Sequence, residues 1–117
     1  MRFSDVVSNS FLNRFELVDS EQRSKDHPET WGHPPQEVLN RVQPGYFVKV
    51  GVTHPELNGE RFWGIVRKVG ANLEIQIDQD MVNSAQHGLN DKDVLFVQHR
   101  HIFGIMDANG VTLWVAA

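Results

Sequence analysis

The part of the chain after residue 45 is a close succession of short segments with the alternating pattern of β-strands. The clearest is 73–78, where Leu73, Ile75 and Ile77 alternate with polar residues and so share one face of a strand. Four further segments are bounded by residues that favour turns; they are 46–53, 61–69, 94–99 and 111–115. A short turn is predicted at 101–104. Five such strands predict a small antiparallel sheet, curled or closed into a barrel in the style of SH3 domains.

The first 44 residues predict one or two short helices in front of this sheet. In the first 20 residues or so, apolar residues recur at helical spacings and predict one helix face; they are Phe3, Val6, Val7, Phe11, Phe15 and Val18. Residues 34–42 begin with two prolines and predict a second helix. The polar stretch 19–33 predicts a solvated connection. The predicted fold class is α+β, a single domain in which a helical prefix (1–44) packs on a β-rich module (45–117).

Composition is that of an ordinary globular domain. The chain has 117 residues, of which 40% are hydrophobic and 22% charged, enough for one hydrophobic core. No apolar run approaches the roughly 20 residues needed to cross a bilayer. The first residues, Met1 to Asp5, lack the basic and apolar regions of a secretory signal. We therefore expect a cytoplasmic location and no contact with a membrane.

The charge and the cysteine content limit the reactions and the partners that the chain can have. Cysteine is absent, which excludes disulfides and thiolate catalysis. The net charge of −4 disfavours nucleic acid as a partner, because affinity for phosphates depends on Lys and Arg. The charges are unevenly distributed, however: a basic group, Lys49, Arg61, Arg67 and Lys68, precedes an acidic group, Asp78, Asp80, Asp91 and Asp93. The negative net charge therefore does not exclude a basic strip beside an acidic loop.

Short motifs in the second half are similar to those of one bacterial family. They are Gly45 to Val50, Gly59 to Val66, Leu73 to Asp80, Leu89 to Val94 and the pair His101-Ile102. In this order they resemble the domain-of-unknown-function family 2314, typified by YegJ-like proteins, over residues 45–107. The stretch 90–94 lacks the family's usual glycine, and Gln79 stands where asparagine is frequent. The family has no established activity, so the resemblance implies a compact β module and no particular chemistry.

The first candidate site is the segment Arg61-Phe62-Trp63. An exposed Trp63 beside Arg61 would stack on a base, a peptide side chain or a partner's aromatic ring. The alternative, which the usual burial of large aromatic residues favours, turns Trp63 into the core and leaves Phe62 on the opposite side. Arg67 is included in the same candidate surface.

The second candidate is a metal site. His99 and His101 would lie on one side of an extended strand, and a third ligand would come from His54, His87, Asp78 or Asp80. A His-x-His pair is a weak signal, and the strict geometry of metal sites favours histidines that only form hydrogen bonds. We therefore expect no metal and no other cofactor.

The remaining chemical motifs point away from catalysis. The acidic residues Asp78, Asp80 and Asp91 are of the type that binds calcium, but they do not have the spacing of an EF-hand. A turn in which aspartates form hydrogen bonds with the nearby backbone explains them better. No serine stands in a nucleophile elbow, and no phosphate-binding glycine loop is present.

The leading hypothesis is a non-catalytic protein-binding module, such as an inhibitor, an immunity protein or an accessory subunit of a bacterium or its mobile elements. Its candidate binding residues are Arg61, Trp63, Arg67, Asp78, Asp80, Asp91 and Asp93. Two alternatives stay open: a small metal-dependent hydrolase-like enzyme that uses His99 and His101, and a single-stranded nucleic-acid binder along Lys49, Arg61, Trp63, Arg67 and Lys68. A protein is the expected partner, and an exposed strand edge at 94–97 would allow a homodimer.

Overall fold

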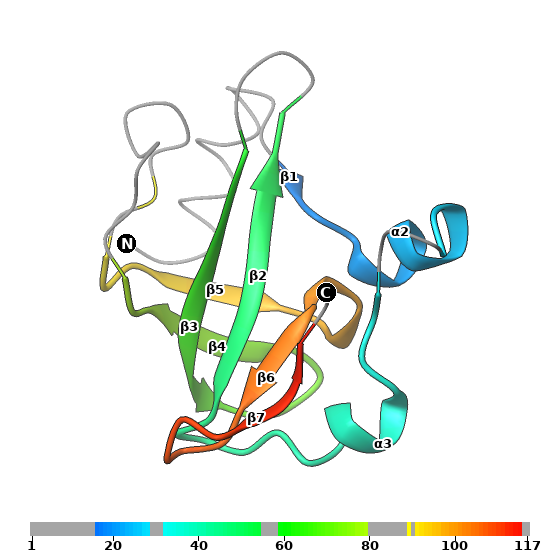
Figure 1. Cartoon of the computed structure of the whole chain (residues 1–117). Coiled ribbons are helices and arrows are strands. Elements are labelled where there is room, and N and C mark those ends of the chain that lie inside the picture. The colour runs from blue at the N-terminus through cyan, green and yellow to red at the C-terminus, as the bar shows by residue number, and fades with distance from the viewer. Residues whose placement is uncertain (1–15, 29–31, 55–58, 80–88, 90, 116–117) are drawn as a thin grey trace.

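The computed structural model describes residues 16–28, 32–54, 59–79, 89 and 91–115. Within these ranges the chain forms a seven-stranded antiparallel sheet and two short α-helices (Figure 1). The strands are β1 (Glu16–Leu17), β2 (Phe47–Thr53), β3 (Glu60–Lys68), β4 (Leu73–Ile77), β5 (Val94–Val97), β6 (Gly104–Met106) and β7 (Thr112–Val115). The helices are α2 (Ser20–Asp26), α3 (Gln36–Leu39) and the 3-10 turn η1 (His99–His101). The expected combination of an antiparallel sheet with short helices is confirmed.

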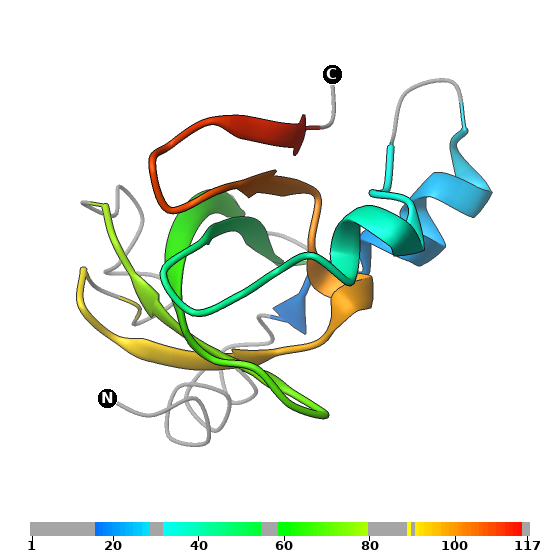
Figure 2. The ribbon, with the colours of Figure 1, turned by 90° about the horizontal axis from the view of Figure 1, so that it is seen from below.

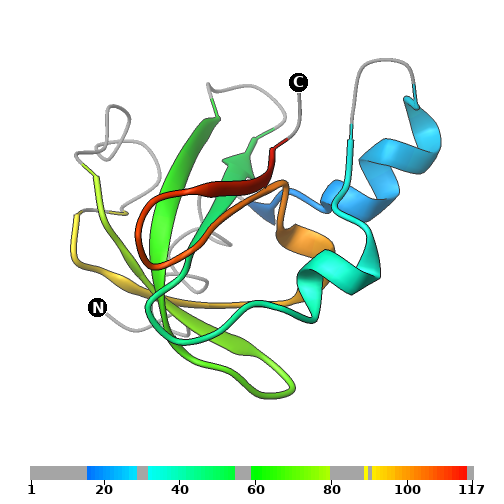
Figure 3. The same ribbon diagram turned by 60° about the horizontal axis from the view of Figure 1, so that its bottom comes forward.

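The sheet is open and curled. Its strands lie in the order β5-β4-β3-β2-β6-β7, and β1 pairs with the end of β2. β6 and β1 share one edge of β2, because the Phe103 N–H donates to the Lys49 carbonyl at 3.0 Å and the Val18 N–H to the Gly51 carbonyl at 2.9 Å. Figures 2 and 3 show the curl, which brings β4 and β5 opposite β6 and β7. The described part thus has seven strands rather than about five, and no pairing of β5 with β7 closes it into a barrel.

The hydrophobic core lies inside the curl. It consists mainly of inward side chains of β2, β3 and β4, with contributions from α3 and β5; the fully buried members include Val48, Val50, Phe62, Leu73, Ile75, Ile77 and Leu95. The inward face predicted for residues 73–78 is confirmed.

The prediction that Trp63 points into the core and Phe62 away from it is wrong. Phe62 is fully buried, whereas Trp63 is half-buried on the other face of β3. Residues paired across neighbouring strands share a face. Phe62 pairs with the core residue Val50, while Trp63 pairs with Lys49. Pairing with β2 therefore decides which aromatic ring is buried.

Residues 16–28 also differ from the prediction. Glu16–Leu17 forms a strand where a helix was predicted, and Ser20–Asp26 forms α2 where a solvated connection was predicted. Asp19 starts α2, since its Oδ1 accepts a hydrogen bond from the Gln22 N–H at 2.9 Å. Most of the predicted first helix falls on residues 1–15, which lie outside the described residues.

Several predicted boundaries shift as well. The helix predicted over 34–42 is present but short, since α3 comprises only Gln36–Leu39. β5 ends at Val97 and is followed by η1, so residue 99 does not belong to a strand. The predicted turn at 101–104 leads directly into β6, a strand of three residues that the sequence pattern did not indicate. Among the described residues, none of the helices has the length and apolar character needed to cross a membrane.

Candidate binding surface on the outer face of the sheet

The face of β2 and β3 that points away from the core carries a group of cations and aromatic rings. Lys49 and Trp63 are paired directly across the two strands, and Arg61 lies further along, opposite Gly51. Phe103, just before β6, covers Gly51: a Cβ added there would lie 3.5 Å from the Phe103 ring. We call Lys49, Arg61, Trp63 and Phe103 the outer-face cluster.

Each cation of the outer-face cluster lies over an aromatic ring. Lys49 Nζ is 5.9 Å from the ring centroid of Trp63 and 5.9 Å from that of Phe103, and Arg61 Cζ is 5.2 Å from the Phe103 centroid. Phe103 is buried beneath them, whereas Lys49 and Trp63 are half-exposed and Arg61 is exposed. Lys49 forms no ion pair with any described residue. The Lys49 ammonium group can therefore bind an anionic group of a partner.

Half-buried apolar side chains extend the same face. Phe47 lies two residues before Lys49 and pairs with Ile65 of β3 and Met106 of β6, so these side chains also point outwards. Trp63 reaches across β2 to β6, since a Cβ on Gly104 would lie 3.1 Å from its ring and 2.9 Å from Lys49 Cβ. The outer face thus offers a partly apolar surface with two cations at its centre.

The described members of the predicted acidic group lie at the C-terminal end of β4. Lys92 Nζ is 3.1 Å from Asp78 Oδ1 and 3.6 Å from Asp91 Oδ1, so one lysine serves two carboxylates. The hydrogen bond to Asp78, followed by the charge of Asp91, raises the pKa of Lys92. Asp93 follows in the same turn, and its carbonyl accepts a hydrogen bond from the Ile77 N–H. Asp80 lies outside the described residues.

A chain of hydrogen bonds joins this acidic end to Arg67. Arg67 Nη1 donates to Gln76 Oε1 at 2.9 Å, and Gln76 Nε2 donates to the Lys92 carbonyl at 3.1 Å. Gln76 pairs with Ile65 and therefore faces outwards. The structure thus places Arg67 on the same face as Arg61 and Trp63, with the lysine-paired carboxylates beyond it.

The two histidines proposed as metal ligands are engaged in local hydrogen bonds. His99 and His101 lie in η1, not on one side of an extended strand. His101 Nδ1 accepts from the Gln98 N–H at 3.0 Å, and His99 Nδ1 lies 3.2 Å from Gln36 Nε2, an amide donor. In the described part of the chain, no group of three His, Asp or Glu residues is arranged to hold a metal ion.

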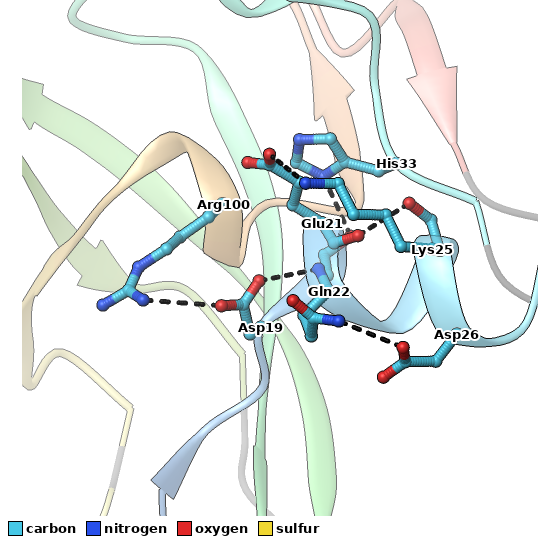
Figure 4. A network of polar contacts seen from close by, with 9 residues as sticks. Asp19, Glu21, Gln22, Lys25, Asp26, His33 and Arg100 are labelled. Atoms are coloured by element: carbon cyan, nitrogen blue, oxygen red, sulfur yellow. Dashed lines mark hydrogen bonds and ion pairs between the residues drawn. The ribbon is translucent and has the colours of Figure 1, made fainter.

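Sequence reasoning missed a polar network between α2 and η1 (Figure 4). Ser20 Oγ lies 3.1 Å from His33 Nδ1 and 3.3 Å from the Gly32 carbonyl oxygen, and Asp19 Oδ2 accepts from Arg100 Nη1 at 3.4 Å. Burial lowers the pKa of His33, against the opposing effects of Glu21, the Ile102 carbonyl and Asp19. Ser20 is fully buried, so it is not exposed as a nucleophile. We interpret the network as structural.

The fold and its outer face define a small antiparallel β-sheet protein with an aromatic and cationic surface. No family model, curated protein or solved structure matches the chain. The resemblance of residues 45–107 to family 2314 therefore remains a prediction.

Proposed function

We propose that this chain is a non-catalytic protein-binding module that recognises its partner with the outer-face cluster. The main support is the position of Lys49, over the rings of Trp63 and Phe103 and without an ion pair among the described residues. A partner with a carboxylate next to an apolar side chain would complement this arrangement. The carboxylate would bind the cations and the apolar group would pack on Trp63. Trp and Arg are also enriched among the residues that dominate interface energies.

The resemblance of residues 45–107 to family 2314 supports a bacterial source. The chain is small and acidic, has no cysteine and has a helical segment before the sheet; these features support an inhibitor, an immunity protein or an accessory subunit in the cytoplasm. The curl of the sheet supports a relationship to SH3-type barrels, which bind proline-rich protein segments in aromatic-lined grooves. The hydrolase-like alternative has less support, because His99 and His101 already use their Nδ1 atoms locally.

The test is affinity capture from a lysate of the source organism with quantitative mass spectrometry. The variant Lys49→Gln/Arg61→Gln removes both cations and keeps polar, though shorter, side chains at these positions. We expect it to reduce the amount of captured partner at least about tenfold, since loss of one member of a charge pair that is buried in an interface costs about 2 kcal/mol or more. The control is Arg41→Gln/Lys68→Gln, which makes the same change in net charge at exposed positions outside the outer-face cluster. It should capture the partner as the wild type does.

Two results would overturn the proposed surface. If both glutamine variants capture the partner equally well, the outer-face cluster is not the binding site. A partner lost instead on charge reversal of Asp78, Asp91 and Asp93 would place the site on the acidic turn. Capture of no protein by the wild type would contradict the binding-module function itself.

Single-stranded nucleic acid is a second candidate because one face carries Lys49, Arg61, Arg67 and a half-exposed Trp63. Fluorescence anisotropy with labelled oligonucleotides checks this directly. Binding that weakens steeply with added salt would support it, as phosphate contacts release counterions. Absent or salt-insensitive binding would eliminate it.

A further inference from the structure

β7 forms one outer edge of the sheet. It pairs with β6 on one side, and on its other side no described strand pairs with it. Figure 2 shows β7 at the outside of the curled sheet. In an antiparallel strand, alternate N–H and C=O groups point away from the neighbouring strand. The outer edge of β7 therefore presents backbone donors and acceptors that another strand can pair with.

This edge lacks the features that usually prevent pairing. Residues 111–115 read Val-Thr-Leu-Trp-Val, with no charge and no proline. Val111 and Val115 are 57% and 45% exposed. The opposite edge strand, β5, also lacks charge and proline, but Leu95 and Val97 are fully buried and none of its four residues is exposed. Of these two edge strands in the described part of the chain, only β7 has exposed valines at its ends, and valine favours β-strands.

The turn before β7 holds this strand in place. Asp107 Oδ1 accepts hydrogen bonds from the Asn109 N–H at 2.9 Å and the Val111 N–H at 3.0 Å. The Asp107 N–H donates to the Val111 carbonyl at 2.9 Å. Gly110 has a φ of 80°, a left-handed conformation that suits glycine in this turn. Because the strand is already ordered, little conformational entropy is lost when a partner strand pairs with it.

We propose that β7 pairs with β7 of a second copy of this chain to form an antiparallel homodimer. The segment 111–115 has a valine at each end and Leu113 at its centre. In a two-fold pair centred there, Val111 faces Val115 of the other copy and Thr112 faces Trp114, so both ends make the same contacts. Pairs of β-branched and aromatic residues stabilise antiparallel strands, and no like charges oppose one another. The two seven-stranded sheets would become continuous.

Sedimentation velocity over about 10 μM to about 1 mM protein tests the proposal, since a short strand pair predicts a weak dimer. The variant V111K/V115K places like charges opposite each other and should raise the dissociation constant at least about tenfold. Both positions are exposed, and urea unfolding verifies that the variant is folded. The control V69K changes a valine of similar exposure, 50%, immediately after β3. It should dimerise as the wild type does.

The variant V111K/V115E tests the direction and register of pairing. It carries as many substitutions as V111K/V115K, but in the proposed antiparallel pair each lysine faces a glutamate, so it should dimerise more strongly than V111K/V115K. A parallel pair would bring like charges together in both variants. A wild type that stays monomeric over the whole range would overturn the proposal. So would V111K/V115K dimerising like the wild type, or V69K losing the dimer to the same extent.

Discussion

The imidazole of His101 closes the 3-10 turn in which it lies. Its Nδ1 accepts the hydrogen bond from the Gln98 N–H, and a proton on this nitrogen would break that bond. Burial, and after it the charge of Arg100, lowers the pKa of His101 to about 4, while Asp19 has the opposite effect. The folded protein therefore binds a proton at this ring less readily than the unfolded chain, whose histidine has a pKa of about 6.5.

We expect the free energy of unfolding to decrease as the pH falls from about 6.5 to about 4, because in this window the unfolded state takes up the proton first. The stabilisation is fully present above the unfolded pKa. The ring is only partly buried and water screens it, so the effect is on the order of 1 to 2 kcal/mol. Asparagine can accept the same hydrogen bond without titrating. The variant His101→Asn should therefore show a flatter pH dependence in urea unfolding.

The control is His27→Asn at an exposed position, which should keep the wild-type pH dependence. Some dependence will persist in both variants, because burial also lowers the pKa of His33. If His101→Asn and His27→Asn show the same slope as the wild type, His101 does not control acid stability.

Part of the outer-face cluster could be predicted from single residues, and part could not. Arg61 and Trp63 are candidates on chemistry alone, since a tryptophan ring stacks on bases and attracts cations, and an arginine stacks on a partner's aromatic ring. Which of Phe62 and Trp63 is buried depends on the pairing of β3 with β2, which no local pattern specifies. Phe103 joins the cluster through long-range pairing of β6 with β2, and the sequence placed it in a turn.

At the scale of elements, α2 shows how a short helix escapes detection. The seven residues Ser20–Asp26 are polar, so no apolar periodicity marks them as helical. A local signal was present: Asp19 precedes Gln22 by three residues, the spacing of a capping box. In the folded chain α2 also contacts η1, and its first residue, Ser20, is buried. The two-residue β1 and three-residue β6 are also too short for alternation to reveal them.

We expect Asp19→Ala to lower the free energy of unfolding by about 1 kcal/mol, because the Gln22 N–H loses its cap. Asp19→Ser should retain most of that stability, since a serine hydroxyl also caps helices well and the exposed ion pair with Arg100 contributes little. Asp26→Ala, at the other end of α2, is the matched control and should change stability less. Urea unfolding of the three variants measures this. Equal losses in Asp19→Ala and Asp26→Ala would contradict a specific role for the cap.

At the scale of the whole molecule, the sequence predicted the components better than their assembly. Alternation in 73–78 identified a core face because those residues alone determine it. The number of strands and the openness of the sheet depend on pairings between distant residues, such as β2 with β6. β2 is the centre of this assembly, with β3 on one edge and both β6 and β1 on the other.

This arrangement predicts that the segment 16–28 unfolds together with the sheet. The amides of Val18 and Phe103 donate to carbonyls two residues apart on the same edge of β2, and both residues are buried. If the molecule opens as one cooperative unit, both amides exchange with solvent only through global unfolding. Native-state hydrogen exchange by NMR should then give the two amides free energies of opening within about 1 kcal/mol of each other and of the urea value. Much faster exchange at Val18 would mean that β1 and α2 detach from the sheet before it unfolds.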